Sequence, residues 1–244
     1  MASTNNKALI ATSIFLTAII LLFGLNGSID VWIQNHFYNV QTHTWLIVKG
    51  ERPWLDFILY DGIKKLLIVA YSLLLITLVI GYKKQWVQKY RREILILVLS
   101  GIFVPMTIVG LKTVTNVPCP RDWQMYGGEY PHIGVFDSYP KDFCQKSRIR
   151  CWPAGHASFG FSLLALIVIA RTRRQRYAAL IISLGVAWSM GWYKILKGDH
   201  FLSHTIIAMV MGWFIILWIV KLIDLSRWGT AYVQTKNQEN EEFF

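Results

Sequence analysis

Apolar residues are gathered along the chain into six long runs, separated by segments rich in polar and charged residues. The runs cover residues 8–25, 66–82, 94–111, 154–170, 177–192 and 205–220. A helix needs roughly 17–25 mostly apolar residues to cross a bilayer, and a soluble core would hold one or two such runs rather than six. The pattern therefore predicts an all-α protein, a six-span transmembrane helical bundle with an outer-side loop between spans three and four.

The first run has a second interpretation, as a secretory signal, because Lys7 precedes it. The run is long for the apolar core of a signal, and Gly27-Ser28 is a poor cleavage site. We therefore interpret it as an uncleaved first span.

Positively charged residues mark one side of the predicted bundle. They are Lys7, Lys83, Lys84, Lys89, Arg91, Arg92, Arg171, Arg173, Arg174, Arg176, Lys221 and Arg227. Because Lys and Arg accumulate in cytoplasmic segments, both termini are predicted to be cytoplasmic. Residues 1–228 are expected to form one membrane-embedded domain, and the polar residues 229–244 a disordered cytoplasmic tail.

The composition agrees with a membrane protein, since 54% of the residues are hydrophobic and only 16% are charged. A net charge of +11 would suggest nucleic acid in a soluble protein, but here many cations flank spans, so we expect no nucleic-acid partner. Other cations lie on the outer side, against the charge rule, where loop solvation and phosphate binding are both open explanations. They are Lys112, Arg121, Lys141, Lys146, Arg148, Arg150, Lys194 and Lys197.

All three cysteines, Cys119, Cys144 and Cys151, lie in the predicted outer loop. An oxidising compartment allows one disulfide among three pairings, and we favour Cys119–Cys151 because it would join two of the segments described next. Three unpaired buried cysteines are the alternative. The spacings match no standard zinc pattern, so we expect no metal site.

Three outer-side segments combine the residue types that phosphoryl transfer requires: a nucleophile, a proton donor and cations around the phosphoryl oxygens. Residues 112–123 follow the end of span three, residues 151–158 include the start of span four, and residues 194–204 join spans five and six. The candidates within them are His156, His200 and His204, with the cations Lys112, Arg121 and Lys194. Gly155 would let a backbone N–H group at a helix start approach an anion.

Each of these residues also has a structural interpretation. A lone interfacial histidine is more often structural than catalytic, and lysines at span ends often anchor a helix by snorkelling. If span six extends back to His200, then His200 and His204 share one helix face, where one imidazole could orient the other or both could bind zinc. No Glu gives the pair a His-Glu-x-x-His pattern. The presence of all three segments on one side favours a functional site.

Together the segments resemble the type 2 phosphatidic acid phosphatase family, which shares its active site with vanadium haloperoxidases. The family motifs are Lys-x6-Arg-Pro, Pro-Ser-Gly-His and Ser-Arg-x5-His-x3-Asp. This chain has Lys112 with Arg121, then Pro153-Ala154-Gly155-His156, then Lys194-x5-His200-x3-His204. The resemblance covers roughly residues 94–220 and implies the membrane branch of the family, which suits six spans.

The resemblance implies a role for each matching position. His200 resembles the nucleophile that forms a phosphohistidine, and His156 resembles the acid that protonates the leaving group. Lys112, Arg121 and Lys194 resemble phosphate-binding cations, and Gly155 offers its backbone.

Four positions depart from the family pattern. Arg121 follows Lys112 after eight residues and precedes Asp, Ala154 replaces Ser, Lys194 replaces Arg, and His204 replaces the orienting Asp. Lys lacks the bidentate fork of Arg, and a neutral histidine cannot offset the positive charge of an attacking imidazole. Four carboxylates remain as candidates for the missing one: Asp122, Asp137, Asp142 and Asp199.

The resemblance therefore implies a metal-independent lipid phosphatase of a bacterial inner membrane, without a cofactor. Its site would face the periplasm or exterior, and it would hydrolyse a phosphate monoester or pyrophosphate of a lipid at the outer leaflet. The family suggests phosphatidic acid, phosphatidylglycerol phosphate, polyprenyl pyrophosphate or lipid A phosphate as substrates. The expected partners are this lipid and the bilayer, with no obligate protein partner. A lipid phosphotransferase with the same site and a catalytically degenerate protein that binds anionic lipid are the alternatives.

Overall fold

The protein is mainly helical, with almost no strand, in the computed structural model, which describes residues 2–25, 27–48 and 50–226. The long helices are α1 (Ala2–Leu25), α4 (Ile63–Ile80), α6 (Arg91–Val114), α9 (Arg173–Leu196) and α10 (Leu202–Leu225). A sixth segment consists of α7 (Gly155–Phe161), the 3-10 turn η4 (Ser162–Leu164) and α8 (Ala165–Ile169). The predicted helical architecture is confirmed, whereas the predicted tail, residues 229–244, lies outside the described residues.

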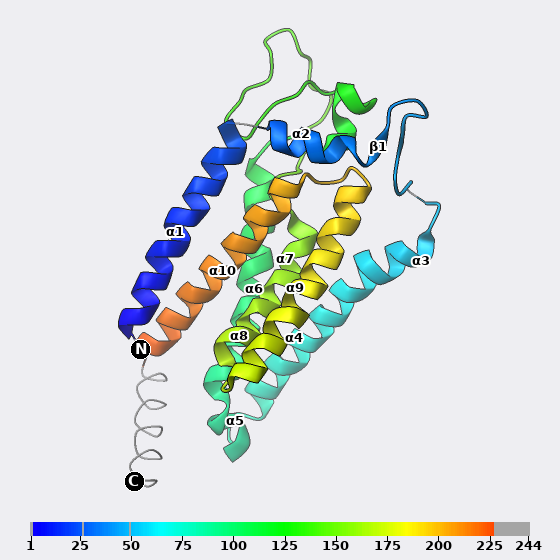
Figure 1. The fold of residues 1–244 in the computed structure, drawn as a ribbon. Helices are drawn as coiled ribbons and strands as arrows, with labels where there is room; N and C mark the ends of the chain where they lie inside the picture. The colour runs from blue at the N-terminus through cyan, green and yellow to red at the C-terminus, as the bar shows by residue number, and fades with distance from the viewer. Residues whose placement is uncertain (1, 26, 49, 227–244) are drawn as a thin grey trace.

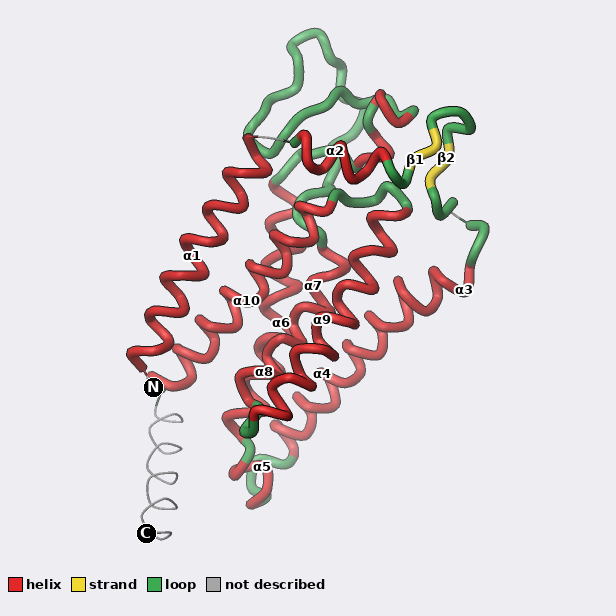
Figure 2. The backbone as a smooth tube through the Cα atoms, viewed as in Figure 1, coloured by secondary structure: helices red, strands yellow, loops and turns green. Residues whose placement is uncertain are grey.

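Short elements connect the long ones. They are α2 (Ser28–Asn35), the strands β1 (Tyr38–Asn39) and β2 (Thr44–Trp45), α3 (Pro53–Leu55), the π-helical turn η1 (Asp56–Gly62), α5 (Gln85–Lys89), and the 3-10 turns η2 (Pro120–Asp122) and η3 (Gln124–Tyr126). The two strands pair antiparallel in a small hairpin (Figure 2), and its Tyr38 and Trp45 side chains pack with Tyr126 of η3.

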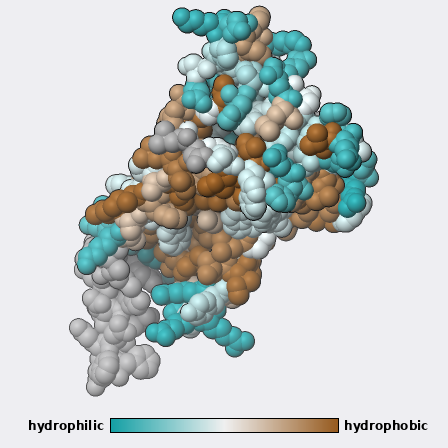
Figure 3. Space-filling view, turned by 45° about the horizontal axis from the view of Figure 1, so that its top comes forward, coloured by the Kyte–Doolittle hydropathy of each residue, from teal (hydrophilic) through white to brown (hydrophobic). Residues whose placement is uncertain are grey.

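Five helices are long and apolar enough to cross a membrane. They correspond to five of the six predicted spans, and α3 and η1 extend the second one back to Pro53. The predicted span 154–170 instead forms the shorter apolar helix Gly155–Ile169, which η4 interrupts. In Figure 3 apolar side chains gather over the middle of the molecule, while hydrophilic ones lie at both ends.

The short sixth segment is the centre of the bundle. Helix α7 packs against α6, α9 and α10, and Phe161 is fully buried in the largest apolar cluster. A Cβ atom on Gly160 would lie 2.5 Å from the Cα atom of Ala187 in α9, so only glycine allows this close contact. Because α7 faces other helices rather than lipid, it does not need the length of a lipid-exposed span.

The bundle has two distinct ends (Figure 1). At one end lie α2, the hairpin and the long loop, residues 115–154, beside the last turns of α6 and α9 and the first turns of α7 and α10. At the opposite end lie α5, the first turn of α1 and the last turn of α10. The three segments that the sequence identified therefore occupy the same end of the molecule.

Candidate active site

Backbone hydrogen bonds hold the three sequence segments together. The N–H group of Arg121 donates to the carbonyl oxygen of Gly198 at 3.0 Å, which joins the first segment to the third. The N–H group of Ala154 donates to the carbonyl oxygen of His204 at 3.1 Å, which joins the second segment to the third. The start of α7 therefore lies directly beside the start of α10.

A disulfide between Cys119 and Cys151 joins the first segment to the second, with their Cα atoms 5.2 Å apart. This is the pairing that the sequence favoured. Cys144 is free and exposed. The cross-link fixes the exit of α6 against the entrance of α7, where the candidate catalytic residues lie.

Asp199 binds two of the candidate phosphate-binding cations. Its Oδ2 atom accepts a hydrogen bond from Nζ of Lys194 at 2.7 Å, and its Oδ1 atom accepts one from the guanidinium of Arg121. Asp199, one of the four carboxylates considered from the sequence, thus contacts two candidate site residues, Lys194 and Arg121. Asp122 and Asp137 accept hydrogen bonds from nearby backbone N–H groups, and Asp122 also lies 3.9 Å from Nε of Arg121.

His200 is buried and electrically neutral at the centre of these groups. Only 3% of its surface is exposed. Burial, followed by the positive charge of Lys112, holds the pKa of His200 well below its ordinary value. His204, His156 and Lys194 also lie close enough to lower this pKa. A neutral imidazole has an unprotonated ring nitrogen, which a nucleophile requires.

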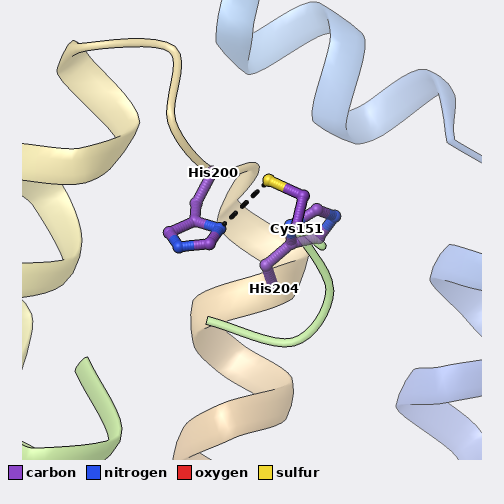
Figure 4. A group of neighbouring side chains, drawn as sticks. All are labelled: Cys151, His200 and His204. Carbon is purple, nitrogen blue, oxygen red and sulfur yellow. Dashed lines mark hydrogen bonds between the residues drawn. The ribbon is translucent and has the colours of Figure 1, made fainter. Parts of the chain in front are cut away.

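One ring nitrogen of His200 faces sulfur rather than another histidine. Its Nδ1 atom lies 3.5 Å from Sγ of Cys151, as the dashed line in Figure 4 marks. Helix α10 begins at Leu202, so His200 precedes the helix and the condition for a shared helix face is not met. The rings of His200 and His204 have centroids 5.8 Å apart.

His204 instead borders a cavity of about 120 Å³ between α1, α2 and the long loop. Its Nδ1 atom is buried and has no hydrogen-bond partner among the described residues. Asp30 and Trp123 line the same cavity. Among the described residues, no hydrogen bond therefore joins His200 to an imidazole or a carboxylate of α10.

Gly155 and Lys112 are neighbours at the start of α7. A Cβ atom on Gly155 would lie 3.7 Å from Cδ of Lys112 and 3.3 Å from Cγ2 of Val109. The absence of a side chain thus leaves room for the lysine stem beside the helix backbone. His156 follows in the first turn of α7 and is half-buried.

Lys64 is a cation near this site that the sequence analysis did not identify. Its Nζ atom lies 5.3 Å from the ring centre of Phe159, and its charge acts on His156. The predicted second span began at residue 66, which placed Lys64 in a loop, whereas α4 begins at Ile63. An ionisable residue inside an apolar helix is itself a sign of function.

Cys151, His200 and His204 have ligand atoms within 4.8 Å of one another, which is the geometry of a metal site. Cys151 is oxidised in the disulfide, and the thiolate is the form that binds metal. The positive charge of Lys112 beside the two imidazoles also opposes a cation. These side chains therefore do not fit a metal ion in the oxidised protein.

Comparison with known proteins identifies the family. The model of the PAP2 superfamily matches residues 93–228, a range that includes every candidate site residue. A curated relative, the lipid A 4'-phosphatase of Francisella tularensis subsp. novicida (strain U112), is 22% identical over 204 residues, which are 82% of this chain and 88% of that protein. No solved structure matches the chain. Since the match covers more than half of its length and contains the three segments of the site, the chain belongs to the PAP2 superfamily and is a phosphoric ester hydrolase.

Proposed function

We propose that this lipid phosphatase works through a phosphohistidine intermediate on His200. The observation that carries the proposal is a buried, neutral imidazole surrounded by Lys112, Lys194 and His156. Arg121 shares the carboxylate of Asp199 with Lys194, so it belongs to the same group of cations. Few other functions would bring a nucleophile, a second imidazole and several cations together in one buried place.

The reaction has two steps. In the first, Nε2 of His200 attacks phosphorus, the P–O bond to the lipid breaks, and His156 gives its proton to the leaving oxygen. In the second, His156 takes a proton from water, the oxygen of water attacks phosphorus, and the P–N bond breaks to release inorganic phosphate. Lys112 and Lys194 offset the charge on the phosphoryl oxygens in both transition states.

Substitution of the two histidines tests this mechanism. The purified protein in detergent should release phosphate from a lipid phosphate in the presence of a chelator. His200→Ala should abolish release, and His156→Ala should slow it by roughly 10²–10⁴-fold, the usual contribution of general acid–base catalysis. His36→Ala is the matched control, because His36 is exposed and its Nδ1 atom lies 2.8 Å from the carbonyl oxygen of Trp32 in the preceding helix α2.

Trapping the intermediate gives an independent test. Acid-labile, base-stable radiolabel from a labelled lipid phosphate should remain on the wild-type protein after rapid quenching and be absent from His200→Ala. Full activity in His200→Ala would remove this residue as the nucleophile. Label transferred to a second lipid in place of free phosphate would indicate a phosphotransferase.

The relative directs the choice of substrate. That protein is named for acting on lipid A, so a phosphorylated sugar lipid of this type is the first substrate we propose to test. Phosphatidic acid, phosphatidylglycerol phosphate and polyprenyl pyrophosphate complete the panel. The substrate with the highest kcat/KM identifies the class.

We further propose that the site faces the periplasm or exterior of a bacterial inner membrane, with both termini in the cytoplasm. The basic segments at residues 83–92 and 171–176 support this orientation, because Lys and Arg accumulate on the cytoplasmic side. The free, exposed Cys144 in the long loop provides a direct test. A membrane-impermeant maleimide should label it in intact spheroplasts, while Lys84→Cys in a Cys144→Ser background should react only after lysis. The reverse pattern would overturn the orientation.

A further inference from the structure

The proposed nucleophile has an unusual neighbour. In phosphatases of this type an Asp is expected beside the histidine, and here that position is His204, whose ring lies against a separate cavity. The atom that faces Nδ1 of His200 is Sγ of Cys151, at 3.5 Å. Cys151 is completely buried, so no solvent competes for this contact. The same sulfur lies 2.9 Å from the carbonyl oxygen of Asp199.

We propose that the oxidised sulfur of Cys151 is a positioning group that holds His200 in the tautomer able to attack phosphorus. The proposal rests on the proposed role of His200 as nucleophile. A disulfide sulfur carries no proton, so it can only accept a hydrogen bond. The contact therefore requires the proton of the neutral ring to be on Nδ1, which leaves Nε2 with a free electron pair.

The sulfur differs from a carboxylate in carrying no negative charge. An Asp would stabilise the imidazolium that forms during attack as well as orient the ring. A disulfide sulfur orients the ring without adding charge. The positive charge that develops on the ring must then be balanced by the phosphoryl group itself.

Reduction of the disulfide would reverse the direction of this hydrogen bond. A phosphine and water convert the disulfide to two thiols and a phosphine oxide. The Cys151 thiol carries a proton, and two acceptors lie within its reach, the carbonyl oxygen of Asp199 at 2.9 Å and Nδ1 of His200 at 3.5 Å. We propose that it donates to Nδ1. The ring proton then resides on Nε2, and the nitrogen that attacks phosphorus is blocked. The activity should therefore depend on the oxidation state of Cys151 itself, in addition to the cross-link.

A set of variants separates the sulfur contact from the cross-link. All are made in a Cys144→Ser background, because Cys144 is the free cysteine that would react with thiol reagents. Cys119→Ala removes the cross-link and leaves a thiol on Cys151. Methyl methanethiosulfonate then converts this thiol to a methyl disulfide and releases methanesulfinic acid. The capped sulfur has no proton and no cross-link.

We expect Cys119→Ala to lower kcat about tenfold or more with little change in KM, because the reactive tautomer becomes the minor form. Capping should restore most of kcat. The double variant Cys119→Ala/Cys151→Ala, treated with the same reagent, is the control and should not recover. Nitrogen NMR of histidine-labelled protein, with His200 assigned by its loss in His200→Ala, should report Nδ1–H in the oxidised and capped proteins and Nε2–H in the uncapped thiol protein.

Several results would overturn the proposal. If the capped protein stays as slow as the uncapped one, the cross-link alone matters. If Cys119→Ala is as active as the parent protein, the sulfur contact has no catalytic role. If Cys119→Ala does not fold, nitrogen NMR of the oxidised parent protein tests the proposal instead. An Nε2–H tautomer of His200 in that protein contradicts the proposal. Full activity of His200→Ala would instead refute the phosphohistidine mechanism, and the tautomer measurement distinguishes that failure from this one.

Discussion

Asp30 should make the stability of the fold depend on pH. It lies in α2, only 6% of its surface is exposed, and its Oδ1 atom accepts a hydrogen bond from the N–H group of Ser203 at 2.9 Å. The carboxylate of α2 thereby satisfies a free N–H group in the first turn of α10, as a capping residue would. Burial raises the pKa of Asp30 to about 6, although the hydrogen bonds from Ser203 oppose this change.

The magnitude follows from the difference in pKa between the two states. The pKa rises from 3.8 to about 6, and each pKa unit corresponds to about 1.4 kcal/mol, which gives about 3 kcal/mol. Since the folded pKa is the higher one, the folded state holds the proton between these values and the unfolded state does not. The contribution to stability is therefore complete below pH 4 and is lost as the pH rises to 6.

Asp30→Asn is the perturbation, because it keeps the shape and the acceptor oxygen but cannot ionise. Thermal unfolding in detergent micelles, followed by tryptophan fluorescence from pH 4 to pH 8, compares the two proteins. The melting temperature of the wild-type protein should fall relative to the variant between pH 4 and pH 6, and the difference should be constant above pH 6. His132, whose pKa burial lowers, titrates in both proteins and cancels in the comparison. Burial raises the pKa of the nearby Tyr126 to about 12, outside the range. Parallel curves for the two proteins would refute the reasoning.

Two further substitutions test the packing around the site. Gly160→Leu should destabilise the protein by about 3 kcal/mol or more, because the added side chain would meet the backbone of Ala187; Gly185→Ala, where a Cβ meets nothing within 4 Å, is the control, and equal melting temperatures would contradict the expectation. Lys197→Met should cost about 2 kcal/mol, because it leaves Asp56 without the cation that binds it at 2.7 Å. This value is lower than for a fully buried pair, since 34% of the Asp56 side chain is exposed. Chemical denaturation of the variant in micelles measures it, and an unchanged unfolding midpoint would argue against the pair.

Hydropathy predicted the helices well because burial in lipid demands long apolar runs. It made the helices too short at their ends, because polar residues continue a helix into the membrane–water interface. Helix α9, for example, begins at Arg173 rather than at residue 177. Thr172 and Gln175 form a capping box at this start. Hydropathy could not show that residues 154–170 form a shorter, interrupted helix, nor that Gly160 brings this helix into close contact with α9.

The candidate site was predictable where residue type and order carry the chemistry. The three segments were identified from histidines and cations at span ends, and they do meet at one end of the bundle. The partner of His200 was not predictable, because a sequence separation of 49 residues divides it from Cys151. The motif suggested His204 for that place. Only the three-dimensional structure shows that α10 begins after His200.

The position of Asp199 explains how the cations coexist and why it does not bind His200. Lys194 and Asp199 are both buried, and two unpaired cations in such a place would repel each other strongly. The carboxylate binds Lys194 and Arg121 at once. An ammonium has three donors and a guanidinium five, so both cations can keep Asp199 and still bind a phosphoryl group. The carboxylate that precedes His200, the proposed nucleophile, is thus engaged in holding the cations. The ring of His200 is left with an uncharged sulfur, and in the mechanism we propose its charge during attack is balanced by the phosphate that the cations bind.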